Sequence, residues 1–449
     1  MNNPRSLFSA LRFPLSVFLL LIPVISCGQA PKHQGKNAFN VDDSLLSIPV
    51  DTSYSFIRYD SNCLIIPADS SLFNGFAKKW HRLLSTGEGN ISIVQIGASH
   101  VQGGTLPHRI RYNILTAARR ATTSHPQSAS ASWLVSDRGL LFPYSAAAKC
   151  NNPYDYKIQR SHALELTRNV YREPLVRLGL CGIAVTARDS LAEIGITLNE
   201  PDIDFATSSI TLLGEGSKNV VPFLKVINND TLILQPLEVD TTLRRYTYRL
   251  DTPADSFYIV LPCTPGDSFS ITGVHLANQL PGISYHSIGV NGAAVSDYLN
   301  KCPHFTTDLA LIKPDLVIFC IGINDASGSN FDTVVFRQRY LQLIDSVRSI
   351  SPDCAFVFFT NNDSYRRVRR KYAVNENALL AREAFFRIAA ATGGVVWDQF
   401  TVMGGLTSME KWQAADLAQR DRIHFTRKGY QLIADLFSDA LLRSLQRKP

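Results

Sequence analysis

Apolar and polar positions follow a helical rhythm, then a strand rhythm, then a helical one between residues 71 and 121. Residues 71–86, "SLFNGFAKKWHRLLST", place apolar side chains at helical spacing, and "NISIVQIGAS" at 90–99 has the pattern of a buried strand. "LPHRIRYNILTAARRA" at 106–121 returns to helical spacing and carries a basic face. A strand, a polar turn and a helix in this order predict the first unit of an α/β layer.

Between about residue 150 and residue 280 the pattern changes to short runs rich in β-branched and aromatic residues. Examples are "AEIGITLN", "RRYTYRL" and "FYIVLPC", and Asn, Asp, Gly and Pro separate such runs at intervals near ten residues. Short strands with turn residues at this spacing are typical of an antiparallel sandwich. The middle of the chain is therefore predicted to be a β domain.

The α/β rhythm returns after the β-rich stretch. "DLVIFCIGIND" at 315–325 is a predicted strand, and helical and strand patterns then alternate up to a terminal helix at 426–445. Strands that alternate with helices imply a parallel, doubly wound sheet. The simplest arrangement is one α/β domain in two parts, at 46–150 and 279–449, interrupted by a β domain at 151–278.

Residues 1–26 combine a short basic segment with the apolar stretch "FPLSVFLLLIPVIS", which is short and broken by proline. This is typical of a secretory signal peptide rather than a membrane span. Its end, "VISC", resembles a bacterial lipobox, in which cleavage leaves the cysteine, here Cys27, to carry lipid. An ordinary signal peptide with an incidental cysteine is the alternative. We expect a lipid-anchored protein with a polar tether at 27–45, on the periplasmic side or in the outer membrane of a bacterial cell envelope.

Composition narrows the classes of function. The chain has 449 residues, of which 45% are hydrophobic and 18% charged, so it can build a large core and is not a disordered solvating protein. The net charge of +7 is mild, and no nucleic-acid-binding pattern is present, so no nucleic-acid partner is expected. Seven cysteines besides Cys27 are widely spaced, without a zinc-type cluster, and one or two disulfides among them would fit an oxidising compartment.

Five residues with catalytic potential lie at or beyond predicted strand ends. A serine needs a neighbouring base to become a nucleophile, and the oxyanion formed on an attacked carbonyl needs preorganised donors. Ser99 follows the first strand, Gly292 lies in the tight loop of "SIGVNGAA", and Asn324 follows the strand of "DLVIFCIGIND". "DRIHFT" places Asp421 three residues before His424. Parallel sheets gather such loops along their carboxyl edge, where sites form.

In four blocks the chain resembles the SGNH/GDSL hydrolases, which are named for Ser, Gly, Asn and His. "GASH", "SIGVNGA", "GIND" and "DRIHF" match these blocks in order. The resemblance implies Ser99 as nucleophile and His424 as base, oriented by Asp421. It also implies an oxyanion hole made of the backbone amides of Ser99 and Gly292 and the side chain of Asn324. Each block alone has a structural explanation, such as a helix N-cap for Ser99; their conjunction favours catalysis.

The resemblance extends to one extracytoplasmic branch of the family. "RGLLFPYSAAA", "PGISYHSIGVNGAA" and "VMGGLTSMEKW" are similar to sequences of esterases related to peptidoglycan O-acetylesterases. In that branch a carbohydrate-binding-like β domain lies between the first two blocks. The resemblance therefore implies a flavodoxin-like three-layer SGNH hydrolase domain with a parallel sheet, interrupted by an inserted antiparallel β-sandwich of jelly-roll or carbohydrate-binding type.

Two positions depart from the family pattern. Ala98 stands where the first block usually has Asp, and Ser287 stands where the second block usually opens with Asn. The missing carboxylate bears on the geometry of the turn more than on the mechanism. Three further residues, His100, Gln102 and Gly289, are candidates for substrate binding, because they lie next to the predicted nucleophile or in the second block.

Other basic and aromatic residues have structural explanations beside functional ones. "YRRVRRKY" at 365–372 is either a solvated face or a rim for an anionic glycan. Trp80, Trp133, Trp397 and Trp412 are expected in the core rather than on sugar rings. The sequence has no metal-ligand cluster, phosphate loop or dinucleotide fingerprint, so neither a metal nor a cofactor is expected.

The sequence predicts a serine esterase that removes O-acetyl groups from a cell-envelope or extracellular polysaccharide, an acetylated glycan or peptidoglycan, through an acyl-enzyme. An O-acyltransferase with the same triad is one alternative, because only the acceptor differs. A carbohydrate-binding surface lipoprotein with a decayed hydrolase domain is the other, and Ala98 is the feature that favours it.

Overall fold

The computed structural model describes residues 41–446, except 43, 45, 123–133, 135, 200–202, 204, 206, 228–230 and 369–370. The predicted leader, Cys27 and the first part of the tether lie outside the described residues, as does Trp133. Within the described ranges, none of the helices has the length and apolar character that a membrane span requires.

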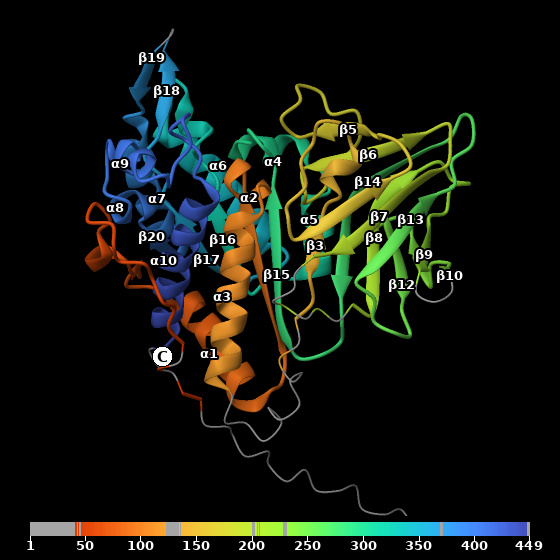
Figure 1. The fold of residues 1–449 in the computed structure, drawn as a ribbon, viewed down its shortest axis with the longest axis horizontal. Coiled ribbons are helices and arrows are strands. Elements are labelled where there is room, and N and C mark those ends of the chain that lie inside the picture. The colour runs from red at the N-terminus through yellow and green to blue at the C-terminus, as the bar shows by residue number, and fades with distance from the viewer. Residues whose placement is uncertain are drawn as a thin grey trace, which may run out of the picture. The chain divides into compact units, whose positions relative to one another are not determined.

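Six strands form a central sheet in the order β1-β20-β17-β16-β2-β15 (Figure 1). Their bounds are Leu64–Ile65 for β1, Asn90–Gly97 for β2, Gly282–Gly289 for β15, Leu316–Cys320 for β16, Ala355–Phe359 for β17 and Val395–Trp397 for β20. Neighbouring strands are parallel except at the edge, where β1 runs antiparallel to β20. Numbered along the chain, the five parallel strands have the flavodoxin-like order 2-1-3-4-5.

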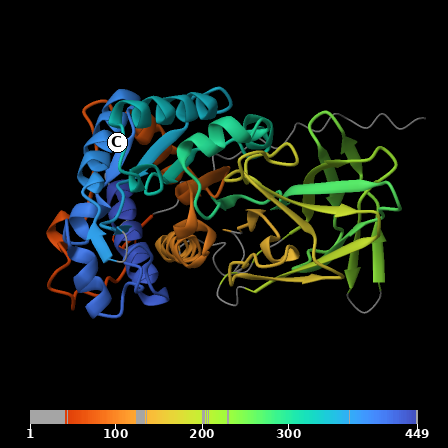
Figure 2. The ribbon, with the colours of Figure 1, turned by 90° about the horizontal axis from the view of Figure 1, so that it is seen from above.

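Helices cover both faces of this sheet (Figure 2). One group comprises α1 (Ser71–Thr86), α3 (Thr105–Ala121) and α10 (Arg427–Gln446), and the other comprises α4 (Val295–Lys301), α5 (Phe305–Ile312), α6 (Thr333–Arg348) and α7 (Asn377–Thr392). Successive side chains of β2 point to opposite faces, so Ile93 joins the buried cluster of the first group and Val94 that of the second. The predicted α/β layering is confirmed.

Two antiparallel sheets occupy residues 139–277, here called the β segment. One sheet has the order β10-β9-β13-β7-β4, and the other runs β11-β12-β8-β14-β6-β5, with β3 paired to β14. The bounds are Gly139–Leu141 for β3, Tyr156–Arg160 for β4, Glu165–Arg168 for β5, Ile183–Arg188 for β6, Ala192–Leu198 for β7, Ser209–Gly216 for β8, Phe223–Ile227 for β9, Thr231–Leu234 for β10, Glu238–Asp240 for β11, Arg245–Arg249 for β12, Ser256–Leu261 for β13 and Ser268–Ala277 for β14. The antiparallel pairing that the sequence pattern predicted is present, and β3 joins it from before the expected boundary at residue 151.

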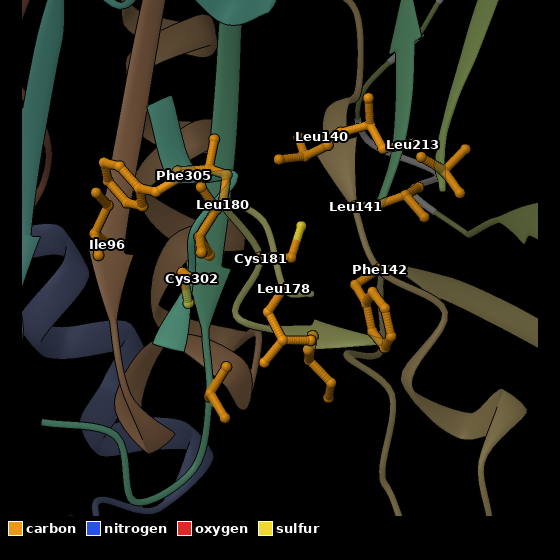
Figure 3. Close-up of a cluster of buried hydrophobic side chains, with 14 of the residues drawn as sticks. Ile96, Leu140, Leu141, Phe142, Leu178, Leu180, Cys181, Leu213, Cys302 and Phe305 are labelled. Atoms are coloured by element: carbon orange, nitrogen blue, oxygen red, sulfur yellow. The ribbon is translucent and has the colours of Figure 1, made fainter. Parts of the chain in front are cut away.

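The β segment shares its core with the parallel sheet. Figure 3 shows one cluster of buried side chains that includes Ile96 of β2, Leu141 of β3 and Leu180, which lies between β5 and β6. Arg244, which precedes β12, also forms a 2.7 Å ion pair with Asp308 of α5, and both side chains are buried. Separating Arg244 from Asp308 would leave two buried charges without a partner, which costs several kcal/mol. The β segment is therefore held firmly enough to contribute residues to a site on the parallel sheet.

One expectation needs correction, that of disulfides. All seven cysteines in the described structure are free thiols, so no disulfide joins them: Cys63, Cys150, Cys181, Cys263, Cys302, Cys320 and Cys354. Cys320, the last residue of β16, is partly buried and lines a small cavity. The basic run at 365–372 folds into regular structure. It forms a hairpin of β18 (Tyr365–Val368) and β19 (Lys371–Val374), which projects at the top of Figure 1.

Candidate active site

Ser99 stands where β2 ends and the chain turns into the short helix α2 (Ser99–Gln102). The turn is tight, since a side chain on Gly97 would come within 2.2 Å of the Val101 side chain. The amides of Val101 and Gln102 both donate to the carbonyl oxygen of Ala98, so backbone groups close the turn without the carboxylate that the family usually has there. As the first residue of α2, Ser99 has an amide without a partner inside that helix.

The side chains of Ser99, His424 and Asp421 are hydrogen-bonded in series. The Ser99 hydroxyl lies 2.8 Å from Nε2 of His424, and Nδ1 of His424 lies 2.7 Å from Oδ2 of Asp421. The other oxygen of Asp421 accepts the backbone amides of Ile423 and His424 at 2.9 and 3.0 Å. This order of contacts is that of a serine nucleophile, its base and the carboxylate that orients the base.

The Asp421 carboxylate is kept ionised. Burial alone would raise its pKa, but the hydrogen bonds from the His424 ring and from two backbone amides outweigh burial, so the pKa lies below its usual value. A negative carboxylate holds the proton of the neutral imidazole on Nδ1. Nε2 is then left to accept the proton of the serine.

Gly292 and Asn324 follow β15 and β16, the two strands that flank β2, so their loops lie on either side of Ser99. Gly292 is exposed and has φ +85°, a left-handed conformation that favours glycine. Within the described part of the chain its amide has no hydrogen-bond partner. The Asn324 side-chain amide donates to the Ala293 carbonyl at 2.9 Å, which orients its second N–H. These groups can act as oxyanion donors.

Residues 290–295, here called the Gly292 loop, are held by polar side chains on both sides. Gln102 of α2 is buried, and its Oε1 accepts the amide of Asn291 at 2.7 Å. Asp325 accepts the amide of Val295 at 3.2 Å, and burial raises the pKa of Asp325 to about 6. The structure thus places Gln102, predicted as a substrate contact, as a support of this loop. Asp325 was not singled out in the sequence, although it directly follows the third block.

A third support comes from the β segment. Arg168, the last residue of β5, donates from Nη2 to the carbonyl oxygen of Asn291. Val170 lies close by, 3.9 Å from where a side chain on Gly292 would begin. Sequence reasoning missed Arg168, because one arginine at the end of a strand carries no signal of what it will contact. The β segment therefore touches the loop that presents an oxyanion donor.

Replacing Arg168 with alanine is expected to lower kcat for a small acetyl ester about tenfold with little change in KM, because a hydrogen bond from a charged group contributes about 1.5–3 kcal/mol and its loss loosens the Gly292 loop. Steady-state kinetics measures this, and Arg168→Lys should recover part of the loss. Exposed Arg172→Ala is the matched control. Unchanged kcat together with a lower melting temperature would show that Arg168 only stabilises the fold.

His100 and Gly289 are placed beside the site but are engaged elsewhere. Nδ1 of His100 lies 2.8 Å from the Tyr430 hydroxyl, and the ring centre lies 5.3 Å from that of His424. Burial, helped by His424, lowers the pKa of His100 to about 3, so this ring stays neutral. Gly289 is buried, and a side chain there would come within 2.5 Å of the Gln102 amide. The close approach of β15 and α2 therefore requires this glycine.

Three of the tryptophans expected in the core, Trp80, Trp397 and Trp412, are buried there. The basic hairpin is joined to the loop that carries Asp421 and His424, since the amide of Tyr365 donates to the carbonyl of Arg422 at 3.1 Å.

Within the described ranges, no group of three or more His, Cys, Asp or Glu side chains could hold a metal ion.

A serine, an imidazole and a carboxylate in series at the carboxyl edge of a doubly wound sheet define the class of serine hydrolases. Residues 263–432 match the GDSL-like Lipase/Acylhydrolase family, which confirms the predicted resemblance to SGNH hydrolases. The matched stretch includes Gly292, Asn324, Asp421 and His424. Ser99 lies outside it, on the other side of the β segment.

Solved structures of esterases are similar to this chain. One, described as "Peptidoglycan O-acetylesterase in action, 5 min", has a TM-score of 0.66 and 19% identity, over 86% of this chain and 99% of that chain. A catalytic mutant of the acetylxylan esterase Axe2 from Geobacillus stearothermophilus has a TM-score of 0.29 and 19% identity, over 36% of this chain and 73% of that one. A family two carbohydrate esterase from Cellvibrio japonicus has a TM-score of 0.27 and 10% identity, over 65% and 98%. Of these three, the first alone shows a shared overall fold. No curated protein matches the sequence.

Proposed function

We propose that this chain is a serine esterase of the SGNH type that removes O-acetyl groups from a cell-envelope or extracellular polysaccharide. The observation that carries the proposal is the 2.8 Å contact between the Ser99 hydroxyl and Nε2 of His424, with Asp421 hydrogen-bonded to the far side of the ring. A serine that only begins a helix has no need of an imidazole at that distance. The family match and the fold support an esterase at the level of class.

The geometry suits a two-step acyl transfer. His424 takes the Ser99 proton on Nε2 as the serine oxygen bonds to the ester carbonyl carbon, and the carbonyl electron pair moves onto oxygen. The amides of Ser99 and Gly292 and the side chain of Asn324 donate to that oxyanion. As the bond to the sugar oxygen breaks, His424 gives the proton to that oxygen. Water, deprotonated by His424, then attacks the acyl-enzyme; the bond to serine breaks, the proton returns to Ser99, and acetic acid is released.

The sequence resemblance, the shared fold and the leader, rather than the geometry of the triad, support three parts of the proposal: the acetyl group, the polysaccharide and the compartment. The sequence resembles peptidoglycan O-acetylesterases, and one such enzyme shares the fold. The leader that ends at Cys27 supports lipid anchoring in a bacterial cell envelope. On this proposal the β segment is an inserted β-sandwich of carbohydrate-binding type that presents the polymer to Ser99.

Incubation with an organophosphonate that reacts with activated serines is expected to label Ser99 and abolish acetate release from O-acetylated peptidoglycan or xylan, because only a deprotonated serine attacks phosphorus. Mass spectrometry locates the label, and an acetate assay follows turnover with and without an unacetylated glycan. Acetyl groups appearing on that glycan would establish the acyltransferase alternative. A folded protein that stays unlabelled and releases no acetate would establish the decayed, carbohydrate-binding one.

A further inference from the structure

A groove lies between the first turns of α3 and α10 and the start of the β segment. Its volume is about 370 Å³, at the lower end of the range of pockets that hold small ligands. The lining includes His108, Arg109, Tyr112, Tyr154 and Arg427, with two amide side chains. Among these described lining residues none is Asp or Glu. The groove therefore offers aromatic faces, cations and neutral hydrogen-bonding groups.

The groove opens at the same edge of the sheet as the reacting groups. Arg427 begins α10 three residues after His424, and α3 begins three residues after the end of α2, the single turn that carries Ser99. Helices that follow parallel strands begin at the carboxyl edge, so the first turns of α3 and α10 lie beside the site. A sugar chain whose acetyl group reaches Ser99 therefore has the groove as a neighbour.

The β segment supplies the opposite wall of the groove. Gly104, just before α3, packs so closely on Pro153 that a side chain there would come within 2.5 Å of it. The next residue, Tyr154, places its ring centre 4.8 Å from that of His108, edge to face. Both parts of the fold thus meet at Tyr154, and the shared core fixes their positions.

Arg427 is the cation of this groove that lacks a carboxylate partner among the described residues. The guanidinium of Arg109 is held by Asp435 at 2.7 Å, whereas that of Arg427 lies 4.5 Å from the centre of the Tyr154 ring and is exposed. A cation in the first turn of a helix is also disfavoured by the helix dipole. A residue that opposes local stability in this way is a candidate for a functional role.

We propose that this groove binds a carboxylate-bearing sugar unit of the substrate, with Arg427 pairing with the carboxylate and the Tyr154 ring contacting the sugar. The proposal rests on the esterase function and narrows its substrate to an anionic polysaccharide. The planar guanidinium matches the two oxygens of a carboxylate, and an aromatic face suits the apolar face of a sugar ring. Uronic acid polymers carry this chemistry, and so do peptidoglycan strands whose muramic acid units have lost their stem peptides.

The test compares Arg427→Gln with Lys428→Gln in the full chain. Lys428→Gln is the matched control, because it removes the same charge from the next residue of the helix. The Lys428 side chain lies over the ring of Tyr54 and not over that of Tyr154. The probes are O-acetylated peptidoglycan strands freed of their stem peptides, acetylated polygalacturonate, acetylated xylo-oligosaccharide as the neutral substrate, and p-nitrophenyl acetate. For Arg427→Gln the ratio of kcat/KM on an anionic polymer to that on p-nitrophenyl acetate should fall about tenfold, the size of one charged hydrogen bond. The ratio for the neutral oligosaccharide should stay the same, and Lys428→Gln should change neither ratio.

The outcomes separate this proposal from the proposed function. A drop on peptidoglycan alone, or on polygalacturonate alone, supports the groove and identifies the source of the carboxylate. An equal drop on the neutral oligosaccharide, or none on either polymer, overturns the groove while the esterase stands. A wild-type chain that turns over no ester overturns the proposed function itself. Tyr154→Leu tests the contact between the Tyr154 ring and the sugar separately. We expect KM for both anionic polymers to rise, and an unchanged KM would contradict this contact.

Discussion

Replacing Ser99 with alanine is expected to lower kcat for p-nitrophenyl acetate by about 10⁴-fold or more, the scale on which serine triads lose activity without their nucleophile. The variant keeps the His424–Asp421 pair and the oxyanion donors, so the activity that remains measures what those groups achieve alone. The hydroxyl is only partly buried and its recorded partner is His424, so the free energy of unfolding should change by no more than about 1 kcal/mol. Steady-state kinetics and thermal unfolding measure the two quantities.

Ser349→Ala is the matched control for this substitution. Ser349 is an exposed serine that caps the end of α6, and losing its hydroxyl should leave kcat unchanged. Turnover by Ser99→Ala at the wild-type rate would refute the enzyme assignment, since no other described serine contacts His424.

Replacing Asp421 with asparagine is expected to lower kcat by about 10³- to 10⁴-fold, because the amide can donate to Nδ1 of His424 and move the ring proton to Nε2. An imidazole protonated on Nε2 cannot accept the proton of Ser99. The two backbone amides that now bond to Asp421 can still bond to the asparagine oxygen, so the loop should keep its shape. Kinetics on the same ester measures the effect, and a melting curve checks the fold.

Asp416→Asn makes a suitable control in the same region. Asp416 is exposed and has φ +56°, a left-handed conformation that asparagine also adopts, so activity should be retained. A loss below tenfold in Asp421→Asn would mean that the backbone around His424, rather than the carboxylate, sets the orientation of the ring.

The β segment shapes the active site directly, in addition to any polysaccharide that it binds itself. Through Arg168 it supports the Gly292 loop, and through Tyr154 it forms one wall of the groove. An insertion joined by a flexible linker could do neither, because both contacts require fixed positions. The shared core and the buried Arg244–Asp308 pair supply that rigidity.

Local pattern was enough to predict most of the α/β elements. The helices at Ser71–Thr86 and Thr105–Ala121 and the strand at Asn90–Gly97 lie within one or two residues of the predicted ranges, because apolar periodicity is a property of neighbouring residues. β1, of two residues, and β15 were not recognised as strands from the sequence. β1 is too short to show a period, and β15 is buried on both faces, so its pattern does not alternate.

By itself, the sequence determined the order of the elements, the α/β class, the β-rich middle and the residues whose chemistry suits ester hydrolysis. Only the tertiary structure decided which of those residues meet. Ser99 and His424, 325 positions apart, come within 2.8 Å, and Gln102 and Arg168 hold Asn291 from 189 and 123 positions away. Such contacts depend on how whole layers pack, which no local spacing encodes, so the roles of Gln102, Arg168 and the groove at Arg427 could not be inferred from sequence.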